Sequence, residues 1–145
     1  MSNTNSYYSE IFHDSVHVAT LVRPKESPEG LSFITDDEKF LQLGIWNYKK
    51  NQDLDLHFHN EFERKSYKTN EFVFVLKGEI ECNLYTEEGE FIESIIVKES
   101  EGIIQHNHAH EYKILKDSII LESKNGPFMG VERDKTVIYA KKKEN

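Results

Sequence analysis

Two histidines, His57 and His59, stand two positions apart in the stretch Leu-His-Phe-His-Asn. Because side chains alternate between the faces of a β-strand, both imidazoles point to the same side if this stretch is extended. Glu71 opens the next apolar run and adds a carboxylate, and His110 adds a third imidazole later in the chain. Borderline divalent metals such as Fe, Mn, Zn and Ni accept this mixture of ligands. We therefore expect these four side chains to form a divalent metal site.

The third imidazole has alternatives. His106 and His108 share one face with His110 if that piece of chain is extended, so each is a candidate ligand. Those that do not bind the metal would lie at the mouth of the site or in solvent. Since histidine exchanges a proton near neutral pH, we expect His106 and His108 as candidate catalytic residues.

Arg64 and Tyr67 follow the histidine pair and are the candidate substrate-binding residues. A guanidinium offers a planar fork of donors that suits a carboxylate or a phosphate. The alternative for Arg64 is a surface ion pair with Glu61 or Glu63. The alternative for Tyr67 is ordinary core packing, which is the commoner use of an aromatic side chain.

The composition predicts one soluble domain over residues 1–145, with its core at about 30–128 and a disordered tail at 140–145. The net charge of −8 disfavours nucleic-acid and membrane partners, because both are anionic. The single cysteine, Cys82, cannot form an internal disulfide, and its alternation with apolar neighbours predicts buried packing. No membrane-spanning stretch or signal peptide is evident, so we expect a cytoplasmic protein.

Short β-branched and aromatic runs separated by turns predict an all-β fold, and helical periodicity is almost absent. A tight reversal at Gly78 predicts a hairpin between the runs that flank it. An edge strand at residues 16–22 is the candidate contact in a homodimer. The expected strands are 16–22, 30–34, 40–48, the stretch around His57 and His59, 71–76, 79–85, 91–97, the two arms of a hairpin at 114–122, and 136–139.

The order His-x-His, then Glu-x6-Gly, then a distant histidine resembles the cupin superfamily, over roughly residues 56–120. The family's first motif falls on four residues: His57, His59, Glu71 and Gly78. Its second-motif histidine falls on His110, because residues 112–115 match the strand that follows the family's metal histidine. The resemblance implies a double-sheet antiparallel β-barrel, or jelly roll, with a metal at its mouth.

Two departures from the cupin pattern stand out. The gap from His59 to Glu71 is long, which places a loop beside the metal, and residues 105–110 lack the usual proline and glycine of the second motif. The chain also resembles a group of small bacterial cupins found among polysaccharide and sugar-nucleotide pathways. The elements shared with that group are residues 30–33, 57–64, 122–128 and 134–135.

Three imidazoles and one carboxylate around a divalent ion leave positions open for water or substrate. We therefore expect an enzyme that uses the metal as a Lewis acid on a small oxygen-rich substrate, either sugar-like or a keto acid, in isomerase or epimerase chemistry. One alternative is an Fe(II)-dependent oxygenase, which uses the same ligands. The other is a non-catalytic cupin that holds metal or sugar without turnover. The expected partners are a small-molecule substrate and a second copy of the chain.

Overall fold

The computed structural model describes residues 5–141, and its strands pair antiparallel. A five-stranded sheet has the order β1 (Tyr8–His13), β2 (Val16–Val22), β8 (Gly102–Gln105), β5 (Glu71–Lys77) and β10 (Ile119–Lys124). A three-stranded sheet has the order β7 (Phe91–Lys98), β6 (Glu79–Tyr85) and β9 (Ala109–Ile114). β3 (Gly30–Phe33) and β4 (Gly44–Asn47) form a separate hairpin, and the short helices are η1 (Pro24–Glu26) and α1 (Val131–Asp134). The all-β prediction is confirmed.

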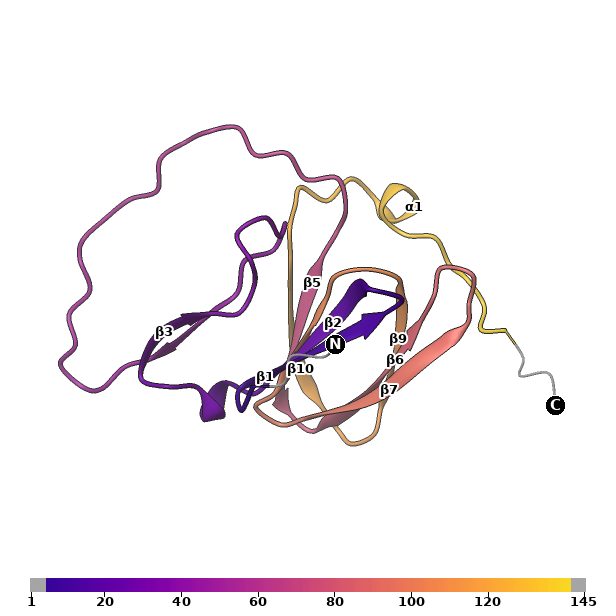
Figure 1. The fold of residues 1–145 in the computed structure, drawn as a ribbon, viewed down its shortest axis with the longest axis horizontal. Helices are drawn as coiled ribbons and strands as arrows, with labels where there is room; N and C mark the ends of the chain where they lie inside the picture. The colour runs from indigo at the N-terminus through magenta and orange to yellow at the C-terminus, as the bar shows by residue number, and fades with distance from the viewer. Residues whose placement is uncertain (1–4, 142–145) are drawn as a thin grey trace.

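The core lies between the five-stranded and three-stranded sheets (Figure 1), because each contributes one apolar face. In β6, Ile80, Cys82 and Leu84 are fully buried while the residues between them are partly exposed. In β5, Val73 and Val75 are buried on the inner face. Glu71 begins the same alternating series, so the period of two carries its carboxylate to the inner face as well.

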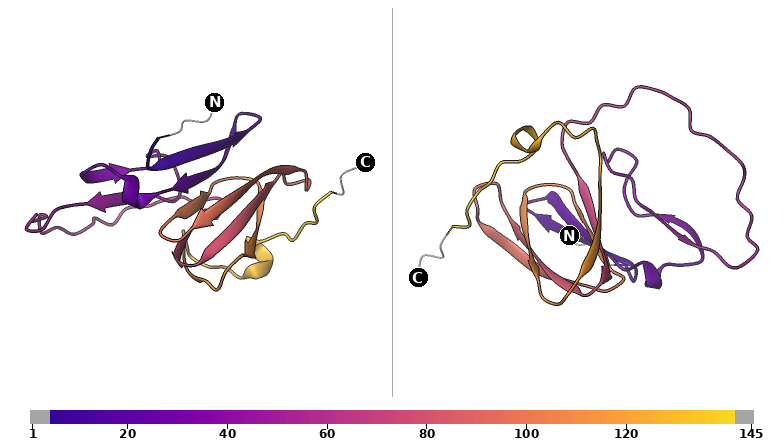
Figure 2. Two further views of the ribbon diagram at one scale, coloured as in Figure 1. Left: turned by 90° about the horizontal axis from the view of Figure 1, so that it is seen from below. Right: turned by 180° about the vertical axis from the view of Figure 1, so that it is seen from behind.

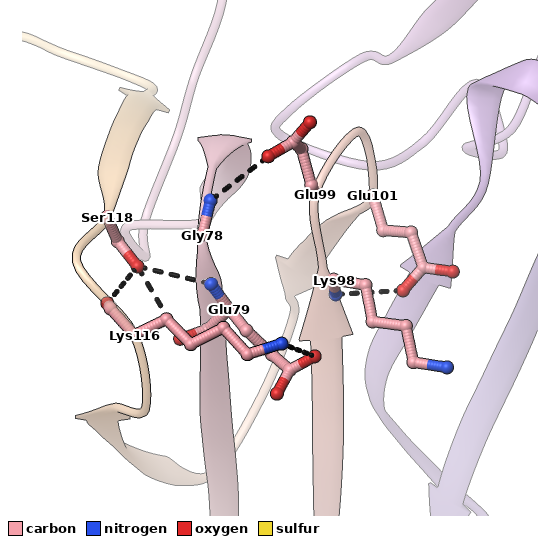
Figure 3. Close-up of polar contacts among 7 residues, drawn as sticks. All are labelled: Gly78, Glu79, Lys98, Glu99, Glu101, Lys116 and Ser118. Atoms are coloured by element: carbon pink, nitrogen blue, oxygen red, sulfur yellow. Dashed lines mark hydrogen bonds and ion pairs between the residues drawn. The ribbon is translucent and has the colours of Figure 1, made fainter.

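The predicted hairpin at Gly78 is wrong, because β5 and β6 belong to different sheets. The chain passes from one sheet to the other at this glycine, which has φ +95° and accepts no Cβ: an added one would lie 2.6 Å from the Asp117 carbonyl oxygen. The predicted hairpin at 114–122 is wrong for the same reason, because the link from β9 to β10 crosses between the same two sheets beside Gly78. Ser118 joins the two crossings, since its hydroxyl accepts a hydrogen bond from the Glu79 amide at 3.2 Å (Figure 3).

Of the other predicted strands, some are confirmed and others are wrong. Those at 16–22, 30–34, 71–76, 79–85 and 91–97 are confirmed within a residue or two, whereas β1 and β8 were not predicted. The predicted strand at 136–139 is wrong, the one at 40–48 shortens to β4, and the stretch around His57 and His59 has no strand at all. Most of the tail predicted at 140–145 lies outside the described residues.

Residues 16–22 do not form an edge strand, which corrects the expected dimer contact. β2 pairs with β1 on one side and β8 on the other, so its backbone donors and acceptors are used within the sheet. The edges of this sheet are β1 and β10. Over the described part of the chain, no helix is long and apolar enough to cross a membrane.

Candidate metal centre

Glu71 and His110 meet across the interior, although they belong to different sheets. Glu71 begins β5, and His110 lies in β9 opposite the fully buried Leu84, so both side chains point between the sheets. His110 Nε2 lies 2.8 Å from Glu71 Oε1. Glu71 is only 8% exposed, so it is a nearly buried carboxylate that contacts an imidazole. The structure therefore brings together two of the four expected ligands.

A set of inward-facing polar side chains supports this pair. The amide nitrogen of Gln105, on β8 beside Glu71, donates to Tyr112 Oη at 3.0 Å and to Cys82 Sγ at 3.1 Å. The Tyr112 hydroxyl in turn donates to Glu71 Oε1 at 3.5 Å. Asn70 ties the entry of β5 by donating to the Gln105 carbonyl at 3.0 Å. Gln105, Tyr112 and Asn70 were not predicted as site residues, because the pairing of β5 with β8 and the meeting of the two sheets are not evident from the sequence.

The electrostatics of this interior keep the Glu71 carboxyl ionised and the Tyr112 hydroxyl and Cys82 thiol protonated. Burial acts to raise the pKa of the Glu71 carboxyl, but the hydrogen bond and charge of His110, with smaller contributions from Lys135 and Lys124, lower it overall. Burial raises the pKa of the Tyr112 hydroxyl strongly and that of the Cys82 thiol to about 12. The site thus holds the Glu71 carboxylate against the His110 imidazole, with the protonated Tyr112 and Cys82 beside them.

His57 and His59 lie far from this pair, on an exposed loop. Residues 53–67 have no regular secondary structure and are exposed throughout, and Figures 1 and 2 show the chain between β4 and β5 as a wide loop outside the sheets. The two rings contact each other edge to face with centroids 5.2 Å apart, and His57 Nδ1 lies 2.8 Å from the Asp55 carbonyl. Within residues 5–141 no group of three or more His, Cys, Asp or Glu side chains is placed to hold a metal ion.

Arg64 and Tyr67 occupy the same loop. The Arg64 guanidinium lies 3.7 Å from the centroid of the Phe62 ring, a cation–π contact, while Glu63 pairs with Lys65 at 3.6 Å. Tyr67 is strongly exposed and touches Phe40 edge to face. These residues are therefore neither core packing nor, in this conformation, close to Glu71.

His106 lies on the opposite face of the five-stranded sheet from Glu71. It follows Gln105, whose side chain points inward, and its Nε2 lies 3.0 Å from the hydroxyl of the buried Thr20. That hydroxyl also lies 2.9 Å from His17 Nε2, so Thr20 joins two imidazoles whose ring centroids are 4.2 Å apart. Burial lowers the pKa of His106 to about 3 and that of His17 to about 4, with smaller effects of nearby charges.

A small cavity of about 170 Å³ lies beside His106. It is lined by Lys39, Phe40, Lys68, Asn70, His106 and Asn107. His108 stands apart, at the bend before β9, with φ +66° and its ring 6.1 Å from that of His13. Neither predicted catalytic histidine therefore joins the Glu71–His110 pair.

Comparisons with known proteins identify no relative: no family model, curated protein or solved structure matches the chain. The candidate site therefore rests on its own geometry and on the motif resemblance.

Proposed function

We propose that the chain is a cupin-type metal-binding protein in which Glu71 and His110 form the fixed half of a metal site and His57 and His59 supply the other half. The observation that carries this proposal is the 2.8 Å contact between Glu71 Oε1 and His110 Nε2, which lies between the two sheets. A carboxylate that is 8% exposed is costly unless a cation or hydrogen-bond donors offset its charge. We also propose that the two sheets form a cupin-type barrel.

The donor set fits a borderline divalent metal. A glutamate oxygen and imidazole nitrogens suit Fe, Mn, Zn or Ni, and such sites keep a position open for water or substrate. Tyr112 and Gln105 would orient the carboxylate, as outer partners commonly do for metal ligands. The site is complete only when the loop bearing His57 and His59 moves toward the two sheets, next to Glu71 and His110.

When bound, a divalent metal supplies Lewis-acid polarisation of a carbonyl or hydroxyl oxygen. We propose that the substrate is small and oxygen-rich, sugar-like or a keto acid, and that the reaction is of the isomerase or epimerase type. Arg64 and Tyr67 share the loop with the histidines, so they would arrive at the mouth together with them and Arg64 would hold an anionic group. We assign no proton transfer to His106, because the sheet separates it from Glu71.

Metal content of the purified protein tests the site. We expect stoichiometric metal in the parent after purification without added metal, and its loss in His57→Ala, Glu71→Gln and His110→Asn. His13→Ala is the matched control, since His13 lies outside the proposed site and should leave the metal content unchanged. A parent that stays free of metal after add-back of Fe, Mn, Zn and Ni would refute the proposal. So would full metal content in all three site variants.

Turnover is tested separately on the metal-loaded parent, with sugar phosphates, nucleotide sugars and keto acids as probes. Isomerised product that disappears in Arg64→Ala supports the Lewis-acid reaction. Consumption of O₂ would instead support the Fe(II) oxygenase. Bound metal without turnover of any probe would favour the non-catalytic cupin.

A further inference from the structure

Three separate segments of the chain meet around the cavity of about 170 Å³ beside His106, on the outer face of the five-stranded sheet. Lys39 and Phe40 come from the loop that joins β3 to β4, and Lys68 and Asn70 come from the residues that lead into β5. The third segment contains His106 and follows β8. Pockets that hold drug-sized ligands have volumes of about 300–1,000 Å³, so this cavity suits a small molecule or one group of it.

The loop between β3 and β4 is stabilised by hydrogen bonds of its own. The side-chain amide of Gln42 donates to the carbonyl oxygens of Asp36 and Lys39, each at 2.9 Å. The backbone amide of Leu43 donates to the hydroxyl of Thr35, also at 2.9 Å. An ordered backbone at Lys39 lowers the conformational entropy that a ligand would have to remove when it binds.

The other two segments are joined by a buried side chain. Asn70 is 5% exposed, and its amide nitrogen donates to the carbonyl oxygens of His106 at 2.7 Å and Gln105 at 3.0 Å. The side chain of Asn125 donates to the Lys68 carbonyl at 3.1 Å. These contacts hold the backbone around the cavity before any ligand arrives, which is typical of binding sites.

The cavity gathers positive charge on a chain whose net charge is −8. Two lysines line it, and no acidic side chain does. Burial and the charges of His17 and Lys39 lower the pKa of His106, which places the Lys39 ammonium near this ring. Lys39 forms no ion pair within residues 5–141, and Lys68 Nζ lies 3.4 Å from Glu87 in an exposed pair of the kind that contributes little. Both ammonium groups are therefore available to an anion.

His106 adds a buried polar atom that lacks a partner. Its side chain is 4% exposed, and its Nε2 lies 3.0 Å from the Thr20 hydroxyl. Its Nδ1 is buried and has no hydrogen-bond partner in the described part of the chain. Such an atom destabilises the folded protein, because it has lost its hydrogen bonds to water. A ligand in the cavity that this ring lines would offer the missing partner.

We propose that this cavity binds the phosphate group of a small molecule, with Lys39 and Lys68 as its two cations and His106 Nδ1 as a third hydrogen-bond donor. A phosphate monoester carries a charge of about −1.5 to −2 at pH 7 and three acceptor oxygens, which matches two ammonium groups and one imidazole N–H. His106 donates at Nδ1 when its Nε2 accepts from the Thr20 hydroxyl. Lysine binds phosphate as a point charge, so it does not need the fixed donor fork of arginine.

The carbon part of a phosphate ester would lie against Phe40, whose ring contacts Tyr67 edge to face. The site does not depend on the proposed metal centre, because the sheet separates His106 from Glu71.

Calorimetric titration of the full chain with inorganic phosphate and with glycerol 3-phosphate tests the site, at an ionic strength held constant with chloride. We expect saturable binding. Tighter binding of the ester would assign the site to an organic phosphate, and tighter binding of inorganic phosphate would assign it to the free ion. Acetate is the carboxylate control, and equal affinity for acetate would overturn the assignment to phosphate. The absence of saturable binding of both phosphate probes would overturn the site itself.

Variants locate the binding. Lys39→Met and Lys68→Met should each weaken the affinity about 10- to 100-fold, because each removes one charged hydrogen-bond donor. Lys39→Arg keeps the charge and should bind more tightly than Lys39→Met. Lys113→Met is the matched control, since it removes the same charge from an exposed position on β9 and should leave the affinity unchanged. Equal affinity in the parent and both site variants would overturn the proposal.

Glu71→Gln separates this site from the proposed metal centre. We expect this variant to bind phosphate as the parent does, whatever its metal content. Loss of phosphate binding in Glu71→Gln, with Lys39→Met unaffected, would show that phosphate binds at the metal and would overturn the site at His106.

Discussion

Replacing Gly78 by alanine tests how the chain crosses between its two sheets. Gly78 has φ +95°, where an L side chain is disfavoured by about 1–2 kcal/mol. Its new Cβ would also lie 2.6 Å from the Asp117 carbonyl and 2.8 Å from the Ser118 Cα, both of which are backbone atoms. Relieving that overlap requires the β9–β10 crossing to shift, and overpacking of this kind costs about 1–3 kcal/mol. We expect Gly78→Ala to lower the free energy of unfolding by about 2–5 kcal/mol, the sum of the two costs.

Gly30→Ala is the matched control, because Gly30 has a similar φ of +104° but no atom within 4 Å of an added Cβ. The control therefore contains the dihedral cost without the overlap, and it shares the loss of unfolded-state entropy that any Gly→Ala change brings. Urea denaturation of both variants measures the difference, with unchanged slopes indicating that both unfold as the parent does. If Gly78→Ala proves as stable as Gly30→Ala, the proposed overlap with the second crossing is wrong.

Two further predictions concern buried titratable groups. The pKa values of His17 and His106 are lowered to about 4 and about 3, so the unfolded chain binds more protons than the folded one below about pH 6.5. The free energy of unfolding should therefore fall as the pH drops from about 6.5 toward 4. We expect a fall of roughly 2–4 kcal/mol, which allows for solvent screening at the partly exposed His17. Urea denaturation at a series of pH values measures how the free energy of unfolding depends on pH. His106→Gln should make this dependence weaker, and His13→Ala should leave it unchanged. The same pH dependence in the parent and both variants would contradict the prediction. The Cys82 thiol, buried and with its pKa raised to about 12, should react with a disulfide reagent at pH 8 only as the protein unfolds, and immediate reaction of the folded protein would show that the interior is open.

The strands were predictable where one strand's own alternation marks a buried face. Ile80, Cys82 and Leu84 identified β6 in this way, whereas β5 was identified by its long apolar run between Glu71 and Gly78. β8 was missed because it is short, and all four of its residues are buried, which leaves no alternation to read. Residues 54–60 show the reverse failure: they alternate as a strand does but form none. A strand also needs an edge to pair with, and periodicity carries no information about that edge.

For the candidate site, the residue types and their order alone indicated an imidazole–carboxylate cation site and named Glu71 and His110 among its ligands. Only the tertiary structure decided that these two meet at 2.8 Å, that Gln105 and Tyr112 support them, and that His106 faces the other side of the sheet. The reason is physical: spacing along a chain determines which side chains share a face, whereas contact between faces depends on which strands pair and where the chain crosses between sheets. Gly78 illustrates this, because a glycine at this position predicts a reversal of the chain equally well within one sheet or between two sheets.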